Sequence, residues 1–81
     1  MERLTLSERI REAIAAAGLS QSDVARRTGN TTGAVSQWIS GQTRQLKTHN
    51  ALALEALTGY RAQWLATGAG PRMADHASVV R

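Results

Sequence analysis

The chain has 81 residues, with 10 Lys and Arg against 6 Asp and Glu and no cysteine, so its formal net charge is +4 at pH 7. A chain of this length forms one domain with a small core, and the lack of cysteine excludes disulfides, thiolate metal sites and a cysteine nucleophile. The excess of cations favours an anionic partner such as nucleic acid. No apolar run approaches the roughly 20 residues of a membrane span, and residues 1–6 lack the apolar core of a signal peptide. We therefore expect a cytoplasmic protein with no membrane association and no small-molecule substrate.

The first predicted helix begins after Thr5, which forms a capping box with Glu8 because each satisfies a free backbone amide of the other. Gly18 is expected to end this helix in a left-handed conformation. Apolar residues recur at helical spacing between these two points and predict one inward face, made of Leu6, Ile10, Ile14 and Ala17.

Two short helices are predicted next, over residues 21–28 and 32–39. Ser20 and Asp23 form a second capping pair, and Gly29 provides the turn between the helices. Inward residues are expected at Val24 and Ala25 in the first helix, and the inner face of the second is marked by Val35 and Ile39, with Trp38 beside them. Two helices joined by a turn of this length indicate a helix-turn-helix.

The rest of the chain predicts a polar, basic loop over 40–48 and a helix over 48–58, followed by a short helix over 61–67. Apolar positions in the longer helix are Leu52, Leu54 and Leu57, and those in the shorter one are Trp64 and Leu65. From Gly68 the composition changes, so we expect a domain over 1–67 and a linker or flexible tail over 68–81. The fold class is therefore all-α, a compact bundle of five helices.

The outward residues of the 32–39 helix are short or amide-bearing and carry no charge. Such side chains can approach base edges in the major groove, and the expected base-contacting residues are Thr32, Gly33, Ser36 and Gln37. The amide of Gln37 can pair with adenine, and the methyl group of Thr32 can touch a thymine methyl group. Gln21 begins a helix where a phosphate can bind, and the loop cations Arg44 and Lys47 can bind phosphates.

At these positions the chain resembles the Cro/repressor family of phage and prophage regulators, the lambda-repressor-like helix-turn-helix proteins. The resemblance covers about residues 6–70. Its matching motifs are Gly18-Leu19-Ser20-Gln21, Val24-Ala25, Gly29, Val35-Ser36-Gln37-Trp38, Gly41, Asn50-Ala51-Leu52, Leu57 and Trp64-Leu65-Ala66-Thr67-Gly68.

The resemblance implies a transcription regulator that binds a palindromic double-stranded DNA operator as a homodimer and has no catalytic residues, metal or cofactor. It implies a phosphate clamp at Gln21, base reading at Thr32, Gly33 and Gln37, and a loop over 40–47 that follows the DNA backbone. The full set of expected phosphate-contacting residues is Gln21, Thr31, Ser40, Gln42, Arg44 and Lys47.

The chain departs from the family pattern at two positions where many members carry a buried arginine–glutamate pair. Here both are isoleucine, Ile14 and Ile39. Because the joint replacement of a buried ion pair by apolar residues preserves packing, we expect these two side chains to contact each other.

Two other interpretations fit the same motif. An antitoxin would regulate its own gene through the helix-turn-helix and hold a toxin with its tail, whereas an interaction module would use the motif only as a scaffold. A weak homodimer is expected to form through an apolar patch around Tyr60 and Trp64 and the tail. An enzyme is not expected, because no nucleophile with a positioned base is evident.

Overall fold

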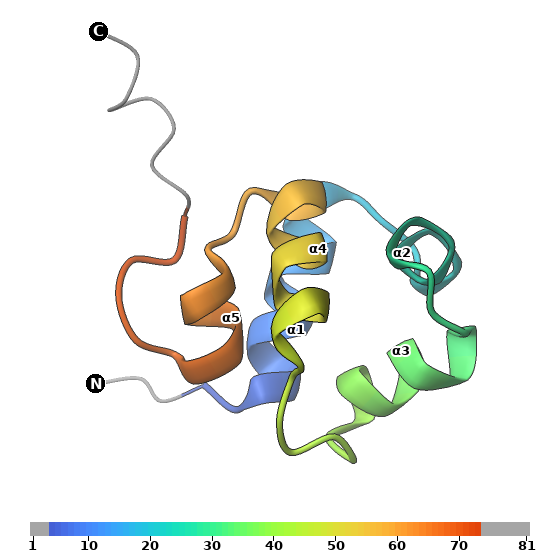
Figure 1. Cartoon of the computed structure of the whole chain (residues 1–81), viewed down its shortest axis with the longest axis horizontal. Helices are drawn as coiled ribbons and strands as arrows, with labels where there is room; N and C mark the ends of the chain where they lie inside the picture. Colours follow the sequence, from blue (N-terminus) through green and yellow to red (C-terminus); the bar gives the residue numbers. More distant parts are fainter. Residues whose placement is uncertain (1–3, 74–81) are drawn as a thin grey trace, which may run out of the picture.

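The computed structural model describes residues 4–73. It contains helices α1 (Leu6–Ala17), α2 (Gln21–Thr28), α3 (Thr32–Ser40), α4 (Thr48–Thr58) and α5 (Ala62–Thr67), arranged as Figure 1 shows. Within the described residues, the β-type pairing consists of one isolated antiparallel bridge, between Tyr60 and Met73. The predicted all-α bundle is therefore confirmed, with α3 one residue longer and α5 one residue shorter than predicted.

Both predicted capping boxes are present. The Thr5 hydroxyl accepts a hydrogen bond from the Glu8 amide at 3.2 Å, and the Glu8 carboxylate accepts one from the Thr5 amide at 2.9 Å. Ser20 and Asp23 make the equivalent pair at 3.0 and 3.1 Å. Each box satisfies amides that the helix itself leaves unpaired, so the sequence signals for the starts of α1 and α2 act as predicted.

Stability should depend on pH through these two carboxylates. Hydrogen bonds from the backbone and side chain of Thr5 lower the pKa of Glu8 below its ordinary 4.5, and those of Ser20 lower the pKa of Asp23 below 3.8. A lowered folded-state pKa stabilises the fold above the unfolded pKa, and this contribution is lost as the pH falls. We expect the free energy of unfolding to decline between about pH 5 and pH 3, and to decline less in the Glu8→Gln/Asp23→Asn double variant. Urea unfolding across this pH range measures the difference, and identical slopes for the two proteins would contradict it.

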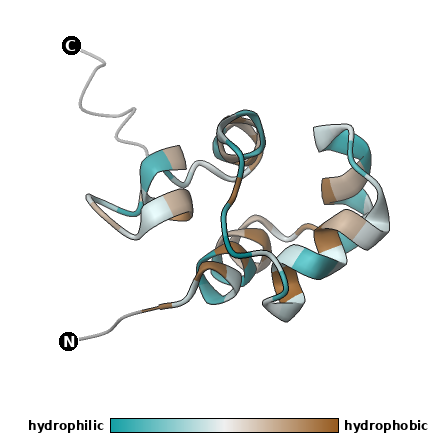
Figure 2. Ribbon diagram, turned by 60° about the horizontal axis from the view of Figure 1, so that its bottom comes forward, coloured by the Kyte–Doolittle hydropathy of each residue, from teal (hydrophilic) through white to brown (hydrophobic). Residues whose placement is uncertain are grey.

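The core is built on α1, which packs against α3, α4 and α5, while α2 packs against α3 and α4. Figure 2 shows the hydrophobic sides of the helices turned toward one another. Five side chains are almost wholly inaccessible to solvent: Ile10, Val24, Val35, Leu54 and Leu65. Ile14 is buried in this core and the half-buried Ile39 packs against it. Both isoleucines therefore contribute to the hydrophobic core, and a direct contact between them stays a prediction.

Two apolar residues of the predicted helices, of which Ala17 was expected to face inward, are exposed. Leu52 has 56% of its surface exposed, and Ala17, the last residue of α1, is also exposed. Residues Leu52 and Leu54 lie about 200° apart around a helix, so they cannot both face the core. The buried face of α4 consists of Asn50, Ala51 and Leu54, so the apolar residues predicted for this helix do not all lie on its inward side.

The described part of the expected tail, residues 68–73, folds back along α1 and α5. The Arg61 amide donates to the Arg72 carbonyl at 2.7 Å. The Arg72 guanidinium pairs with Glu12 of α1 at 2.7 Å and lies 5.2 Å from the ring centroid of Trp64. This stretch therefore belongs to the folded unit, whereas residues 74–81 lie outside the described residues and a tail there stays a prediction.

The aromatic residues expected to form a dimer patch lie inside the domain. Tyr60 and Trp64 are 7% and 5% exposed, and their ring centroids are 5.6 Å apart. Burial, followed by the hydrogen bond and the charge of Glu12, raises the pKa of Tyr60 above its ordinary value, while its hydroxyl donates to Glu12 at 3.2 Å. These rings hold the monomer together, so they do not offer the exposed surface that the sequence suggested.

A buried arginine fixes α5 against α1. Arg9 is 8% exposed, and it donates to the carbonyls of Leu65 at 3.1 Å, Ala66 at 3.3 Å and Leu4 at 2.6 Å. Two of these carbonyls belong to the last turn of α5, where a cation is favourable. Burial lowers the pKa of Arg9 below its ordinary value. No pattern in the sequence marks this residue, because its partners are backbone atoms 56 and 57 residues away.

Candidate nucleic-acid interface

Helix α3 is held in place by α2 and by the core. Val24 and Ala25 of α2 are buried, as are Val35 and Trp38 of α3. Gly29 has a φ of 74°, a left-handed conformation that glycine adopts without strain. The predicted helix-turn-helix is present, with α3 fixed through its apolar side.

The turn between α2 and α3 is also tied to α4. The side-chain amide of Asn30 donates to the Asn50 side chain at 2.9 Å and to the Thr28 hydroxyl at 2.9 Å. Asn50 is buried, so its amide oxygen needs this partner. The sequence did not predict this contact, because it joins side chains 20 positions apart.

The four expected base-contacting residues are all exposed and lie at positions i, i+1, i+4 and i+5 of α3. This spacing puts them on one side of a helix, opposite the buried Val35 and Trp38. Their side chains have no hydrogen bond or ion pair with any other described residue. We call this surface, made of Thr32, Gly33, Ser36 and Gln37, the reading face.

The six expected phosphate-contacting residues are also exposed. Gln21 is the first residue of α2, and Thr31 is the N-cap of α3, whose hydroxyl accepts from the Ala34 amide at 3.0 Å and retains its own proton to donate. The Ser40 hydroxyl lies 3.4 Å from the Gln37 carbonyl, a long hydrogen bond. The remaining three lie in the loop between α3 and α4: Gln42, Arg44 and Lys47.

Two shallow hollows border this loop, and one of them also reaches the reading face. One, of about 290 Å³, lies between α3 and the start of α4, and both Gln37 and Lys47 line it. The other, of about 410 Å³, is lined by Arg44 and Gly41 together with the first residues of α1. The fold therefore brings Gln37 of α3 and Lys47 of the following loop to one surface.

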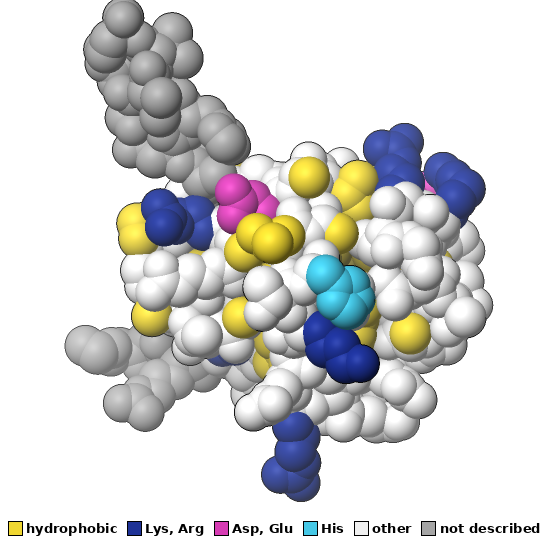
Figure 3. Space-filling model, in the orientation of Figure 1, with side chains coloured by type: hydrophobic (Ala, Val, Ile, Leu, Met, Phe, Trp, Pro, Cys, Tyr) yellow, Lys and Arg dark blue, Asp and Glu magenta, His cyan; other side chains and the backbone are white. Residues whose placement is uncertain are grey.

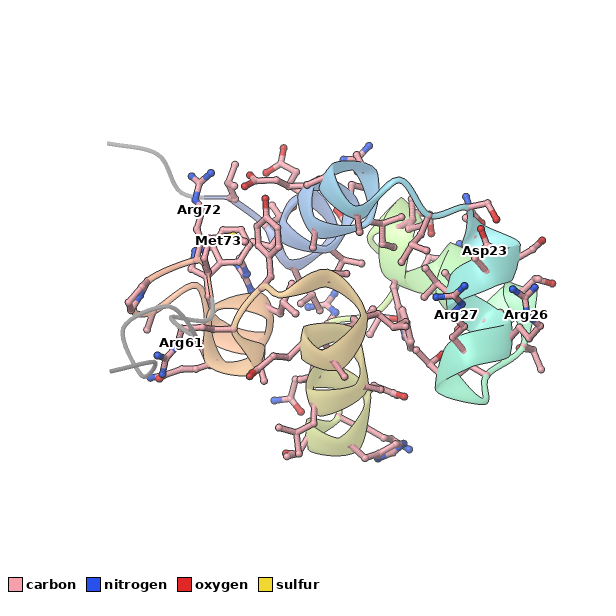
Figure 4. All side chains as sticks on the ribbon, turned by 90° about the horizontal axis from the view of Figure 1, so that it is seen from above. Asp23, Arg26, Arg27, Arg61, Arg72 and Met73 are labelled. Atoms are coloured by element: carbon pink, nitrogen blue, oxygen red, sulfur yellow. The ribbon has the colours of Figure 1, made fainter. Side chains whose placement is uncertain are left out.

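The charge distribution separates this surface from the rest of the protein. Residues 24–54 contain no Asp or Glu, and in Figure 3 the surface over α3 is almost wholly uncharged, with Lys and Arg side chains at its border. Arg44 and Lys47 have no ion pair with a described residue. Arg26, by contrast, pairs with Asp23 at 3.2 Å, and Figure 4 shows both on α2. This acid-free stretch is a signal readable from the sequence that locates the surface.

Within residues 4–73, no group of three or more His, Cys, Asp or Glu side chains is placed to hold a metal ion. None of the helices described there is long and apolar enough to cross a membrane.

Comparison with known proteins agrees with this geometry. The helix-turn-helix family matches residues 10–65, more than half of the chain. The fold is similar to that of the P22 c2 repressor protein, solved in complex with synthetic operator 9T in the presence of Tl⁺, with a TM-score of 0.72 and 25% sequence identity over 83% of this chain and 100% of that one. No curated protein gives a significant match. The chain therefore belongs to the helix-turn-helix family, and its fold is that of the lambda-repressor-like proteins.

Proposed function

We propose that this protein is a sequence-specific regulator of transcription that lays α3 in the major groove of double-stranded DNA. The family assignment and the likeness to a repressor bound to its operator support a DNA-binding transcriptional regulator. The reading face contacts base edges, and the surrounding polar and cationic residues contact phosphates.

One observation carries the proposal: an uncharged, exposed helix face lies within an acid-free stretch that also contains Arg44 and Lys47, two cations with no ion pair to a described residue. Contacts with bases need short polar side chains, since these can reach hydrogen-bonding groups in the groove. Contacts with phosphates need cations and amides on either side, because they set the register of the protein on the duplex. This surface has short polar side chains on α3 and has cations and amides beside them.

We further propose that the protein acts as a cytoplasmic phage or prophage repressor and binds a palindromic operator as a homodimer. One copy of α3 spans only a few base pairs, and two copies related by twofold symmetry would lie about 34 Å apart, one turn of DNA. Because Tyr60 and Trp64 are buried, the large apolar side chains left for contact between copies, among those described, are Leu52 and Met73.

Replacing Gln37 by alanine should weaken binding to the preferred duplex by about 1–3 kcal/mol and relax the preference at one base pair. Binding to random duplex should change little, because the phosphate contacts remain. Gln63→Ala is the matched control, since Gln63 is an exposed glutamine on α5. Fluorescence anisotropy with the two duplexes measures both affinities, and equal values for Gln37→Ala and the parent on the preferred duplex would refute the assignment.

A further inference from the structure

Gly33 differs from the other glycines of known conformation in that its backbone does not require glycine. Six glycines have a positive φ, and Gly33 is not among them. It lies in the first turn of α3, in an ordinary right-handed helical conformation that residues with a side chain adopt without strain. The fold therefore gives no conformational reason for a glycine here.

Packing gives no reason either. A Cβ atom added at Gly33 would meet only the Thr31 hydroxyl oxygen within 4 Å, at 3.8 Å, an ordinary van der Waals contact. The position is exposed. Glycine is less favourable than alanine within a helix because it loses more backbone entropy on folding. The residue thus weakens α3 without filling a structural need.

We infer that Gly33 determines specificity, its missing side chain leaving a notch that receives the 5-methyl group of a thymine. The inference rests on the proposed binding of α3 in the major groove. Around the helix axis Gly33 lies between Ser36 and Gln37 on the reading face, and its lack of a side chain allows a base edge to approach the backbone closely. Glycine has no side-chain donor or acceptor, so apart from the backbone amide that every residue except proline has, it can discriminate only by apolar contact in the space that a side chain would fill. The thymine methyl group is the apolar group that unmodified base pairs present in this groove.

The test exchanges one methyl group for another. The duplex is the sequence that the protein prefers in a random pool, prepared with thymine or with uracil at the position facing Gly33. We expect Gly33→Ala to lower the affinity for the thymine duplex about 10-fold or more, as overpacking does. On the uracil duplex the affinity of the same variant should lie within about 3-fold of the affinity of the parent for that duplex, because the added methyl group of the protein fills the space of the removed methyl group of the base.

Stability provides the second readout. Gly33→Ala should raise the melting temperature by about 3–6 °C, because alanine is the better helix former, so a loss of affinity cannot be ascribed to unfolding. Ala15→Gly, at an exposed position of α1, should lower the melting temperature and leave both affinities unchanged.

Two results would overturn the inference while leaving the proposed function intact: parental affinity of Gly33→Ala for the thymine duplex, or an equal loss on both duplexes. A parent protein that prefers no sequence would overturn the proposed function and the inference together.

Discussion

Arg9→Ala is expected to destabilise the fold by about 3 kcal/mol, a large fraction of the few kcal/mol by which a domain of this size is stable. The substitution removes a buried cation and leaves the carbonyls of Leu4, Leu65 and Ala66 without their donors. Because two of these carbonyls end α5, that helix should detach from α1 early in unfolding. Urea unfolding followed by tryptophan fluorescence measures the loss, since Trp64 lies in α5.

The matched control is Arg11→Ala, which removes the same charge from an exposed position of α1 and should change stability by less than about 0.5 kcal/mol. Arg9→Lys should fall between the two, because an ammonium group keeps the charge and lacks the planar fork of donors. If Arg9→Ala unfolds at the same urea concentration as Arg11→Ala, the buried arginine does not fasten α5.

The largest effect on binding is expected for the Arg44→Ala/Lys47→Ala double variant. Each phosphate contact releases about one counterion, so the loss of two should flatten the dependence of log Kd on log salt by nearly two units. At 100 mM monovalent salt this amounts to a roughly 50-fold weaker complex on specific and random duplex alike. A salt series for parent and variant separates this electrostatic loss from a loss of base reading.

Arg26→Ala/Arg27→Ala is the control for net charge. It also removes two cations, but from α2, and Figure 4 shows these arginines at the end of the molecule opposite Arg61 and Arg72. We expect its salt dependence to match that of the parent within about half a unit. Equal flattening by the two double variants would mean that overall charge, and not the loop beside α3, determines binding.

Local signals account for most of what the sequence predicted. Capping residues such as Thr5 and Ser20 act within one turn of helix, and the spacing of Val35 and Trp38 settles which side of α3 is outward. The reading face could therefore be deduced before its position in the fold was known.

Long-range contacts, either to backbone atoms or between side-chain amides, could not be predicted from such local signals. Arg9 is held by carbonyls of α5, and Asn50 meets Asn30 across the turn. The exposure of Leu52 could not be predicted, because apolar residues surround much of α4 and their spacing does not define one inward face. Arg72 and Glu12 meet because the chain folds back after Gly68, which the glycine-rich composition gave no means of predicting.

Selection of bound duplexes from a random pool tests whether α3 reads DNA. We expect repeated rounds to enrich one sequence with twofold symmetry, its half-sites about one helical turn apart. A pool that stays random after selection would contradict sequence-specific binding and favour a role for the same helices in binding another protein.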